Sequence, residues 1–442
     1  MQAMNTKKTD IKCDLMIIGT GLSGMAAALF AARSGIDAIQ AGTTGQLGFA
    51  SGLIDLLGVH PVADSALVRS PWEGLEQLRL DMPAHPFARM SVPDIRSALE
   101  DFLGFLGQCG YPHYFHLKNN VEMMTPAGTV KPTYALPHTM AEAPACISGR
   151  RPTLIVDFEG LKGFSARQLV FASVSRSHLR PQRIVFPGSS GELYAEPLAR
   201  SLDVAQNRHK LRDAVAPYLA DAEAVGFPAI LGVYRTLDVL ADLSRDLGVP
   251  VFEIPTMLPS VPGLRLREIF EQQLPAEGVQ MLRHTQVQSV GRTPDGCWLF
   301  SAGNGYAKYR IQARAAILCS GRFFGKGLHA DRHGIRETIF DLPVAQPPAR
   351  ELWHHKDFLH PQGHPVNRSG IEIDDSFRPV DEKGRSVYPD LFAAGTLLAH
   401  QDWMRQKCGS GLAIATAYGA VNACKQFLTD RYYANNCITR HK

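Results

Sequence analysis

The stretch that decides the fold lies near the N-terminus and reads Asp14-Leu15-Met16-Ile17-Ile18-Gly19-Thr20-Gly21-Leu22-Ser23-Gly24. Its first five residues are a short, mostly apolar run, which is typical of a buried parallel strand. A Gly-x-Gly-x-x-Gly turn follows, and then an Ala-rich helical stretch over residues 25–33 and a second strand over residues 36–40. This order of strand, glycine turn, helix and strand predicts a βαβ unit that binds a nucleotide.

The glycines of the turn have separate tasks in such a unit. Gly19 permits a tight turn, Gly21 lets a pyrophosphate approach the backbone, and Gly24 lets the helix pack closely on the strand. The helix N-terminus adds free N–H groups and a partial positive charge, which favour phosphate. We therefore predict that the turn contacts the cofactor through Gly19, Gly21, Leu22, Ser23 and Gly24.

The end of the second strand departs from the usual fingerprint. An Asp or Glu normally stands there and binds the ribose hydroxyls. This chain has Gln40-Ala41-Gly42-Thr43 instead. Gln40 or Thr43 can still hydrogen-bond a ribose, but without charge. The sequence thus favours phosphate binding more strongly than adenosine binding.

Three later segments place small residues and glycine after an apolar run or at a helix start. They are residues 316–321 (AILCSG), 388–396 (YPDLFAAGT) and 408–413 (CGSGLA), the last of which opens the final helix. A strand that ends in this way lets its backbone press against a planar or phosphate-bearing ligand. Each segment alone is common. Their order after the glycine turn indicates a single composite site.

Length and composition exclude several classes of protein. A chain of 442 residues is too long for one ordinary core and suggests two domains. The net charge of +4, with both signs mixed throughout, gives no footprint of a nucleic-acid binder. The eight cysteines show no C-x-x-C pair and no zinc or iron–sulfur spacing, so we predict reduced thiols and no metal site.

The apolar stretch over residues 15–32 is interrupted by the glycines of the turn and does not indicate a signal or membrane segment. No other run approaches the roughly 18 to 20 apolar residues of a membrane span. We expect a cytoplasmic protein that reaches the inner membrane surface only through a partner.

The glycine unit lies at one end of the chain and the three later motifs lie at the other. We therefore predict a nucleotide-binding domain from residues 10–59 and 256–430, an inserted α/β domain from 60–255, and a loose tail over 431–442. The strands at 15–18 and 315–318 should then share one sheet. The predicted fold class is α/β, with a Rossmann-like βαβ unit and an inserted second α/β domain.

Together, the four glycine motifs resemble the flavin-binding domain of the fumarate reductase and succinate dehydrogenase superfamily. The resemblance implies that residues 10–59 and 256–430 form a flavin-binding domain and that the fold is that of a two-dinucleotide-binding-domain flavoprotein. In that superfamily the third motif lies along the ribityl–pyrophosphate chain, and the N-terminus of the final helix faces the pyrimidine end of the flavin ring. The resemblance implies flavin contacts at Gly395, Thr396, Gly411, Leu412 and Ala413. We also assign to the flavin site Ser51, Gly52, Val287, Ser320 and Gly321.

A narrower resemblance is carried by residues 49–57 (FASGLIDLL), 83–86 (PAHP), 258–266 (LPSVPGLRL), 319–328 (CSGRFFGKGL) and 333–337 (HGIRE). These segments are similar to the B-subunit family of anaerobic glycerol-3-phosphate dehydrogenases. The resemblance implies one component of a quinone-linked enzyme that oxidises sn-glycerol 3-phosphate to dihydroxyacetone phosphate. It also implies two partners, a flavin-bearing A subunit and an iron–sulfur, membrane-attaching C subunit of glycerol-3-phosphate dehydrogenase.

The form of the flavin and the role of the chain stay open at this point. The B-subunit family is usually assigned FMN, whereas the dinucleotide turn argues for FAD. The chain either holds the substrate site or is a non-catalytic electron relay or structural component of the same complex. A pyridine-nucleotide oxidoreductase would be expected to have a second complete Gly-x-Gly-x-x-Gly unit after a strand, and we find none.

Oxidation of a secondary alcohol phosphate needs a base for the hydroxyl proton and cations for the phosphate. His333 is the predicted base, with His85 as an alternative, and Arg265, Arg322 and Arg336 are the predicted anion clamps. The competing interpretation is a structural or surface role for each of these residues.

Overall fold

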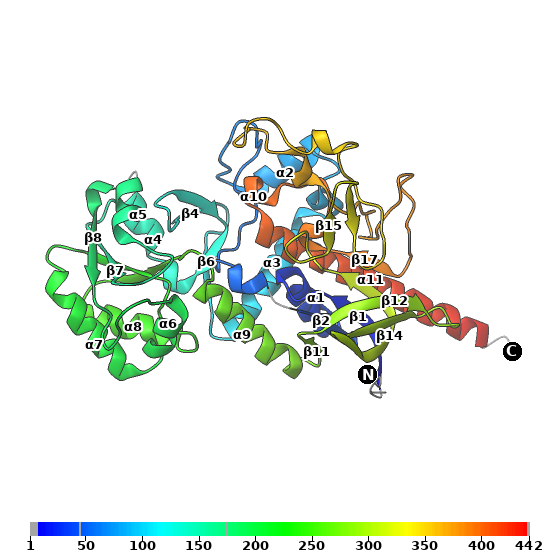
Figure 1. Ribbon diagram of the computed structural model, residues 1–442, viewed down its shortest axis with the longest axis horizontal. Helices are drawn as coiled ribbons and strands as arrows, with labels where there is room; N and C mark the ends of the chain where they lie inside the picture. The colour runs from blue at the N-terminus through cyan, green and yellow to red at the C-terminus, as the bar shows by residue number, and fades with distance from the viewer. Residues whose placement is uncertain (1–7, 44–45, 174–175, 440–442) are drawn as a thin grey trace.

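The computed structural model describes residues 8–43, 46–173 and 176–439. Figure 1 shows two α/β parts side by side, each built around its own sheet. The larger sheet contains β1 (Thr9–Ile18), β2 (Ala38–Gly42), β11 (Gln280–Arg283), β12 (Gln286–Arg292), β13 (Trp298–Asn304), β14 (Tyr306–Leu318) and β17 (Leu391–Ala393). Its strand order is β11-β2-β1-β14-β13-β12, and β17 also pairs with β14.

Strand β1 lies at the centre of the larger sheet. It pairs in parallel with β2 on one side and with β14 on the other, so that Ile17 stands opposite Ile317. The prediction that the strands at 15–18 and 315–318 share a sheet is confirmed. The α/β class and the βαβ unit formed by β1, α1 (Leu22–Arg33) and β2 are confirmed as well.

Helices cover the larger sheet and fill its core. They are α1, α2 (Pro71–Asp81), α3 (Val92–Gln108), α9 (Val261–Ala276), the short α10 (Trp403–Gln406) and the long α11 (Gly409–Thr439). Helix α3 turns one apolar face toward this core, and its residues Ile95, Leu99, Phe102, Leu103 and Leu106 are all buried. In the described part of the chain, no helix is both long and apolar enough to span a bilayer.

The smaller sheet is fully parallel, with the strand order β10-β9-β7-β8. Its strands are β7 (Thr153–Phe158), β8 (Leu179–Ile184), β9 (Ala224–Pro228) and β10 (Val251–Ile254). Its helices are α4 (Ala143–Ser148), α5 (Ala166–Ala172), α6 (Ala195–Leu202), α7 (Ala205–Val215) and α8 (Thr236–Leu247). This second layer lies within the predicted insert.

Three short antiparallel pairs connect or flank the two layers. They are β3 (His113–Phe115) with β6 (Ala135–Pro137), β4 (Val121–Met124) with β5 (Val130–Thr133), and β15 (Leu328–Ala330) with β16 (Ile335–Glu337). Helices α2 and α3 also lie within the range predicted for the insert, yet their buried side chains belong to the core of the larger sheet. Their packing favours a domain boundary later than residue 60, and the exact boundaries stay a prediction.

The predicted tail over residues 431–442 needs a correction. Helix α11 continues to Thr439, and Figure 1 shows it extending past the larger sheet toward the C-terminus. Terminal residues are often poorly ordered, which suggested a loose end, but the segment contains no Gly or Pro that would stop the helix. Residues 440–442 lie outside the described residues.

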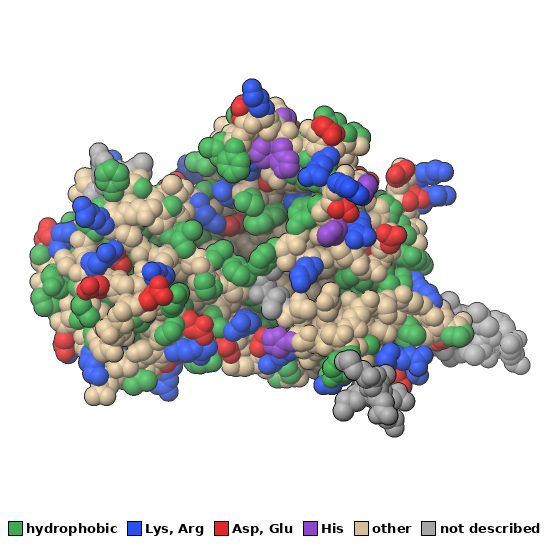
Figure 2. All heavy atoms as spheres, viewed as in Figure 1, with side chains coloured by type: hydrophobic (Ala, Val, Ile, Leu, Met, Phe, Trp, Pro, Cys, Tyr) green, Lys and Arg blue, Asp and Glu red, His purple; other side chains and the backbone are tan. Residues whose placement is uncertain are grey.

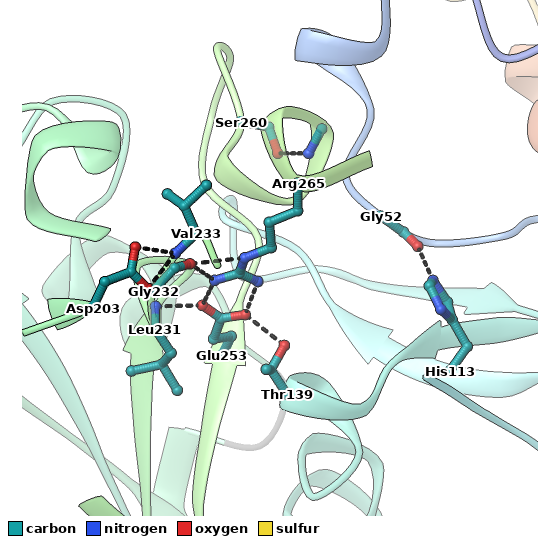
Figure 3. A network of polar contacts seen from close by, with 11 residues as sticks. Gly52, His113, Thr139, Asp203, Leu231, Gly232, Val233, Glu253, Ser260 and Arg265 are labelled. Carbon is teal, nitrogen blue, oxygen red and sulfur yellow. Dashed lines mark hydrogen bonds and ion pairs between the residues drawn. The ribbon is translucent and has the colours of Figure 1, made fainter. Parts of the chain in front are cut away.

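A buried ion pair joins the two layers (Figure 3). Arg265 of α9 donates from Nη1 and Nη2 to the two carboxylate oxygens of Glu253 on β10, at 2.7 Å each. Its Nε and Nη2 also donate to the carbonyl oxygen of Gly232, at 2.9 and 2.7 Å. Arg265 is 1% exposed and Glu253 is fully buried. The prediction of Arg265 as a phosphate clamp is therefore wrong, because its donors are directed at protein acceptors in the interior.

Glu253 is satisfied from several elements at once. Besides Arg265, the Thr139 hydroxyl donates to one carboxylate oxygen at 2.6 Å, and the backbone N–H of Leu231 donates to the other at 2.6 Å. A buried charge is tolerated when it is paired and hydrogen-bonded in this way. Removal of the arginine would leave the carboxylate with neutral donors only.

The variant Arg265→Met should destabilise the fold by about 3–5 kcal/mol, because it leaves Glu253 buried without its counter-charge. Urea unfolding followed by circular dichroism measures the change. Arg267→Met is the matched control, since the Arg267 side chain is 41% exposed and should cost less than about 1 kcal/mol. Equal stability of the two variants would contradict a structural role for the ion pair.

Candidate functional site

A cavity of about 800 Å³ opens where several parallel strands of the larger sheet end. Residues that follow β1, β2 and β14 line it, together with the first residues of α1 and α11. Ligands of open α/β sheets bind at such carboxyl ends of strands. Figure 2 shows this face of the molecule hollowed near its middle, with hydrophobic side chains around the hollow.

The glycine turn forms one wall, and its three glycines meet different constraints. A Cβ on Gly19 would lie 2.2 Å from the carbonyl oxygen of Cys319, and a Cβ on Gly24 would lie 2.1 Å from the carbonyl oxygen of Gly19. These two positions need glycine for packing. A Cβ on Gly21 would meet no protein atom within 4 Å, and its φ of −77° suits any residue. Only a ligand in the cavity would require glycine at position 21.

The residues present fit a phosphate-bearing planar ligand. Gly21 precedes the first turn of α1, and no described side chain caps this helix end, so its backbone N–H groups can bind an anion. Next to the glycine turn, the buried hydroxyl oxygen of Ser320 has no hydrogen-bond partner among the described residues. A buried unpaired hydroxyl beside a cavity indicates a polar ligand atom.

The structure brings eleven of the predicted cofactor contacts together in the cavity wall. They are Gly19, Gly21, Leu22, Ser23, Thr43, Ser51, Val287, Ser320, Gly321, Thr396 and Ala413. The other predicted contacts do not line it: Gly24, Gln40, Gly52, Gly395, Gly411 and Leu412. The individual contacts stay predictions, and the second group has structural reasons for its residue types.

Gln40 supports the glycine turn through a hydrogen bond. Its side chain is fully buried, and Nε2 donates to the carbonyl oxygen of Gly19 at 3.0 Å. It therefore holds the glycine turn in place, while its Oε1 is buried without a partner among the described residues. Thr43 lines the cavity, and a ribose contact from Gln40 or Thr43 stays a prediction.

Gly52, Gly395 and Gly411 permit close packing around the cavity. Gly395 has a φ of +87°, and a Cβ there would lie 2.7 Å from the Cβ of Ser23. A Cβ on Gly411 would lie 2.7 Å from the Cα of Leu56. The carbonyl oxygen of Gly52 accepts a hydrogen bond from Nε2 of His113 at 3.0 Å, as Figure 3 shows. These glycines shape the wall and leave the ligand contacts to their neighbours.

The structure does not bring the four predicted catalytic residues together. Arg265 is part of the interior ion pair. Arg322 donates to the carbonyl oxygen of Ser369 and does not line the cavity, and burial lowers its pKa to about 10. His333 and Arg336 are exposed near the β15–β16 hairpin, outside the cavity wall. Both residues follow the glycine motif at 316–321 closely in sequence, but their side chains lie on the surface of the hairpin.

His85, considered because of its segment, is also structural. It is fully buried, its Nδ1 accepts from the backbone N–H of Phe87 at 3.1 Å, and burial lowers its pKa to about 3. It therefore stays neutral and does not line the cavity.

The predicted site residues did not include the charged residues of the cavity wall. Among the described residues that line the cavity, Asp55, Lys131 and Lys326 carry charge. Asp55 and Lys131 form an ion pair of 2.6 Å. A signal for Asp55 was present, because it interrupts the apolar run of residues 53–57. Lys131 lies in a short strand with no motif, so nothing local marked it. No group of three or more potential metal ligands is found in the described part of the chain.

The chain matches the family model described as an FAD binding domain over residues 14–412. This range includes the glycine turn, the strand ends and the start of α11. Fold, cavity and family model together define a flavoprotein of the FAD-binding oxidoreductase class. The prediction of a flavin is confirmed, and the family indicates FAD, the form that the dinucleotide turn predicted.

Curated relatives narrow the class. The probable B subunit of anaerobic glycerol-3-phosphate dehydrogenase from Halobacterium salinarum (strain R1) is 33% identical over 438 residues, which cover 95% of this chain and 99% of that protein. The corresponding B subunit from Vibrio cholerae serotype O1 (strain El Tor Inaba N16961) is 29% identical over 92% of this chain and 95% of that protein. The chain belongs to the B-subunit family of anaerobic glycerol-3-phosphate dehydrogenases, as the sequence resemblance predicted.

Among solved structures, the chain is similar to 3-ketosteroid delta1-dehydrogenase from Sterolibacterium denitrificans. The sequence identity is 10%, the TM-score is 0.43, and the match covers 94% of this chain and 99% of that one.

The variant Gly21→Ala should fold like the wild type but lose FAD, because the added methyl group meets no protein atom and occupies ligand space. Gly24→Ala should instead destabilise the protein, since its Cβ would collide with backbone. Visible absorbance after gel filtration measures bound FAD, and thermal unfolding measures stability. Full FAD retention by Gly21→Ala would show that the pyrophosphate lies elsewhere.

Proposed function

We propose that the chain is part of a quinone-linked dehydrogenase in which sn-glycerol 3-phosphate is oxidised to dihydroxyacetone phosphate. The observation that carries the proposal is the cavity beside Gly21, where an added Cβ would meet no protein atom within 4 Å. The chain that forms this cavity belongs to the B-subunit family. The names of the relatives supply the substrate. The quinone and the partner A and C subunits follow from the family resemblance.

FAD bound in the cavity would supply the two-electron acceptor for oxidation of a secondary alcohol. The turn at Gly19–Ser23 would hold the pyrophosphate, and Ser320 and Thr396 would donate hydrogen bonds along the cofactor. Of the described residues in the wall, Asp55 is the one carboxylate and none is a histidine. Asp55 is thus the candidate to accept the hydroxyl proton, in place of His333.

Partner subunits are supported by the apolar mouth of the cavity. Phe49, Leu258 and Phe324 line the cavity and are 44%, 57% and 72% exposed. Phe49 and Phe324 pack edge to face with their ring centroids 5.1 Å apart. Exposed large apolar side chains around one opening are typical of surfaces that another protein covers.

A second function, electron relay without a substrate site, is favoured by one observation. The predicted base and clamps do not converge on the cavity, so the chemistry rests on few charged groups. In that case, the A subunit oxidises the substrate and this chain passes electrons onward.

Anaerobic addition of sn-glycerol 3-phosphate distinguishes the two functions. If the substrate site lies in this chain, the purified, FAD-loaded chain should lose its visible flavin absorbance without any partner. Bleaching that requires the A subunit would support the relay. Persistent flavin absorbance in the complex with the A and C subunits would refute both functions.

A further inference from the structure

The ion pair between Lys131 and Asp55 occupies a fixed place in the cavity wall. Lys131 comes from β5 and Asp55 from the loop after the 3₁₀ turn Gln46–Phe49, and their side chains are 22% and 16% exposed. The backbone N–H of Asp55 donates to the hydroxyl of Ser410 at 2.6 Å, and its carbonyl oxygen accepts from the N–H of Gly411 at 2.8 Å. The start of α11 therefore fixes the backbone of Asp55, and the Asp55 carboxylate in turn positions the ammonium group of Lys131.

The charges around this pair do not cancel. The pKa of Lys407 is lowered mainly by burial and next by the positive charge of Lys131, which lies nearby. A Cβ on Gly58 would lie 2.7 Å from the Cβ of Lys407, so this second lysine packs tightly beside the segment that carries Asp55. Arg405 and Asp402 also act on Lys407, so three cations stand near two carboxylates. The N-terminus of α11 adds partial positive charge on the same side.

Lys131 also keeps donors for a ligand. An ammonium group has three N–H donors, and the bond to Asp55 at 2.6 Å is the one side-chain hydrogen bond that Lys131 makes among the described residues. Of the cations that line the cavity, Lys326 is exposed and Lys131 is half-buried. A half-buried ammonium held by a fixed carboxylate is preorganised and weakly screened, which favours an oxyanion.

We propose that Lys131, positioned by Asp55 and with Lys407 behind it, binds the phosphate of a phosphorylated alcohol in this cavity. This inference rests on the proposed function and gives that function the phosphate-binding residue that Arg265, Arg322 and Arg336 do not provide. Asp55 fixes the ammonium through one oxygen, and its second carboxylate oxygen is buried without a partner among the described residues. The phosphate would bring its alcohol next to that oxygen.

Calorimetric titration of the FAD-loaded chain with inorganic phosphate and with sn-glycerol 3-phosphate tests the proposal. Lys131→Met should raise both dissociation constants roughly tenfold or more, because a charge-assisted hydrogen bond is lost. Lys131→Arg should restore most of the affinity. Lys162→Met is the matched control: Lys162 forms a similar pair with Glu192 at 2.8 Å but is 57% exposed and outside the cavity.

Binding needs no turnover, so the test is separate from the proposed reaction. The visible spectrum of each variant reports FAD content, and redox titration reports the flavin potential. Unchanged phosphate affinity in Lys131→Met with normal FAD content would overturn the proposal. A shifted flavin potential with unchanged phosphate affinity would also overturn it and would place the lysine charge against the cofactor. If Lys131 binds phosphate but sn-glycerol 3-phosphate does not reduce the bound FAD, only the proposed function would be contradicted.

Discussion

The close approach of Gly19 to the backbone of Cys319 is the constraint on which the site depends. The N–H of Cys319 donates to the carbonyl oxygen of Ile18 at 2.8 Å, and no side chain on residue 19 would fit beside it. This contact joins the end of β1 to the end of β14, a strand that comes far later in the chain. Because both strands end at the same edge, the N-terminus of α1 and Ser320 face one cavity.

The same constraint explains which parts of the fold were predictable. The glycine pattern, the apolar runs and the 3.6-residue periodicity of α3 are local, and each local preference agrees with the final structure. They sufficed for the βαβ unit and the shared sheet, and most of the residues predicted to contact the cofactor line one cavity. The extent of α11 was missed because terminal residues are often poorly ordered, although residues 431–439 contain no Gly or Pro.

The four predicted catalytic residues do not meet at the cavity for a different reason. An arginine beside a Pro-Gly turn looks the same in sequence whether it faces a ligand or a buried glutamate. Arg265 meets Glu253 only because α9 packs against the smaller sheet, and that contact depends on tertiary structure. Conversely, Lys131 reaches Asp55 from a strand 76 residues later, so no spacing rule could pair them. Sequence periodicity does not show which charged side chains from distant elements will meet in the folded protein.

We expect one FAD to lie across the ends of β1 and β14, with its pyrophosphate at the start of α1. A crystal structure of the FAD-loaded chain is the direct test. It should place pyrophosphate oxygens within hydrogen-bonding distance of the backbone N–H groups of Leu22 and Ser23, and the flavin ring beside residues 410–413. FAD bound with its pyrophosphate away from the glycine turn would contradict it.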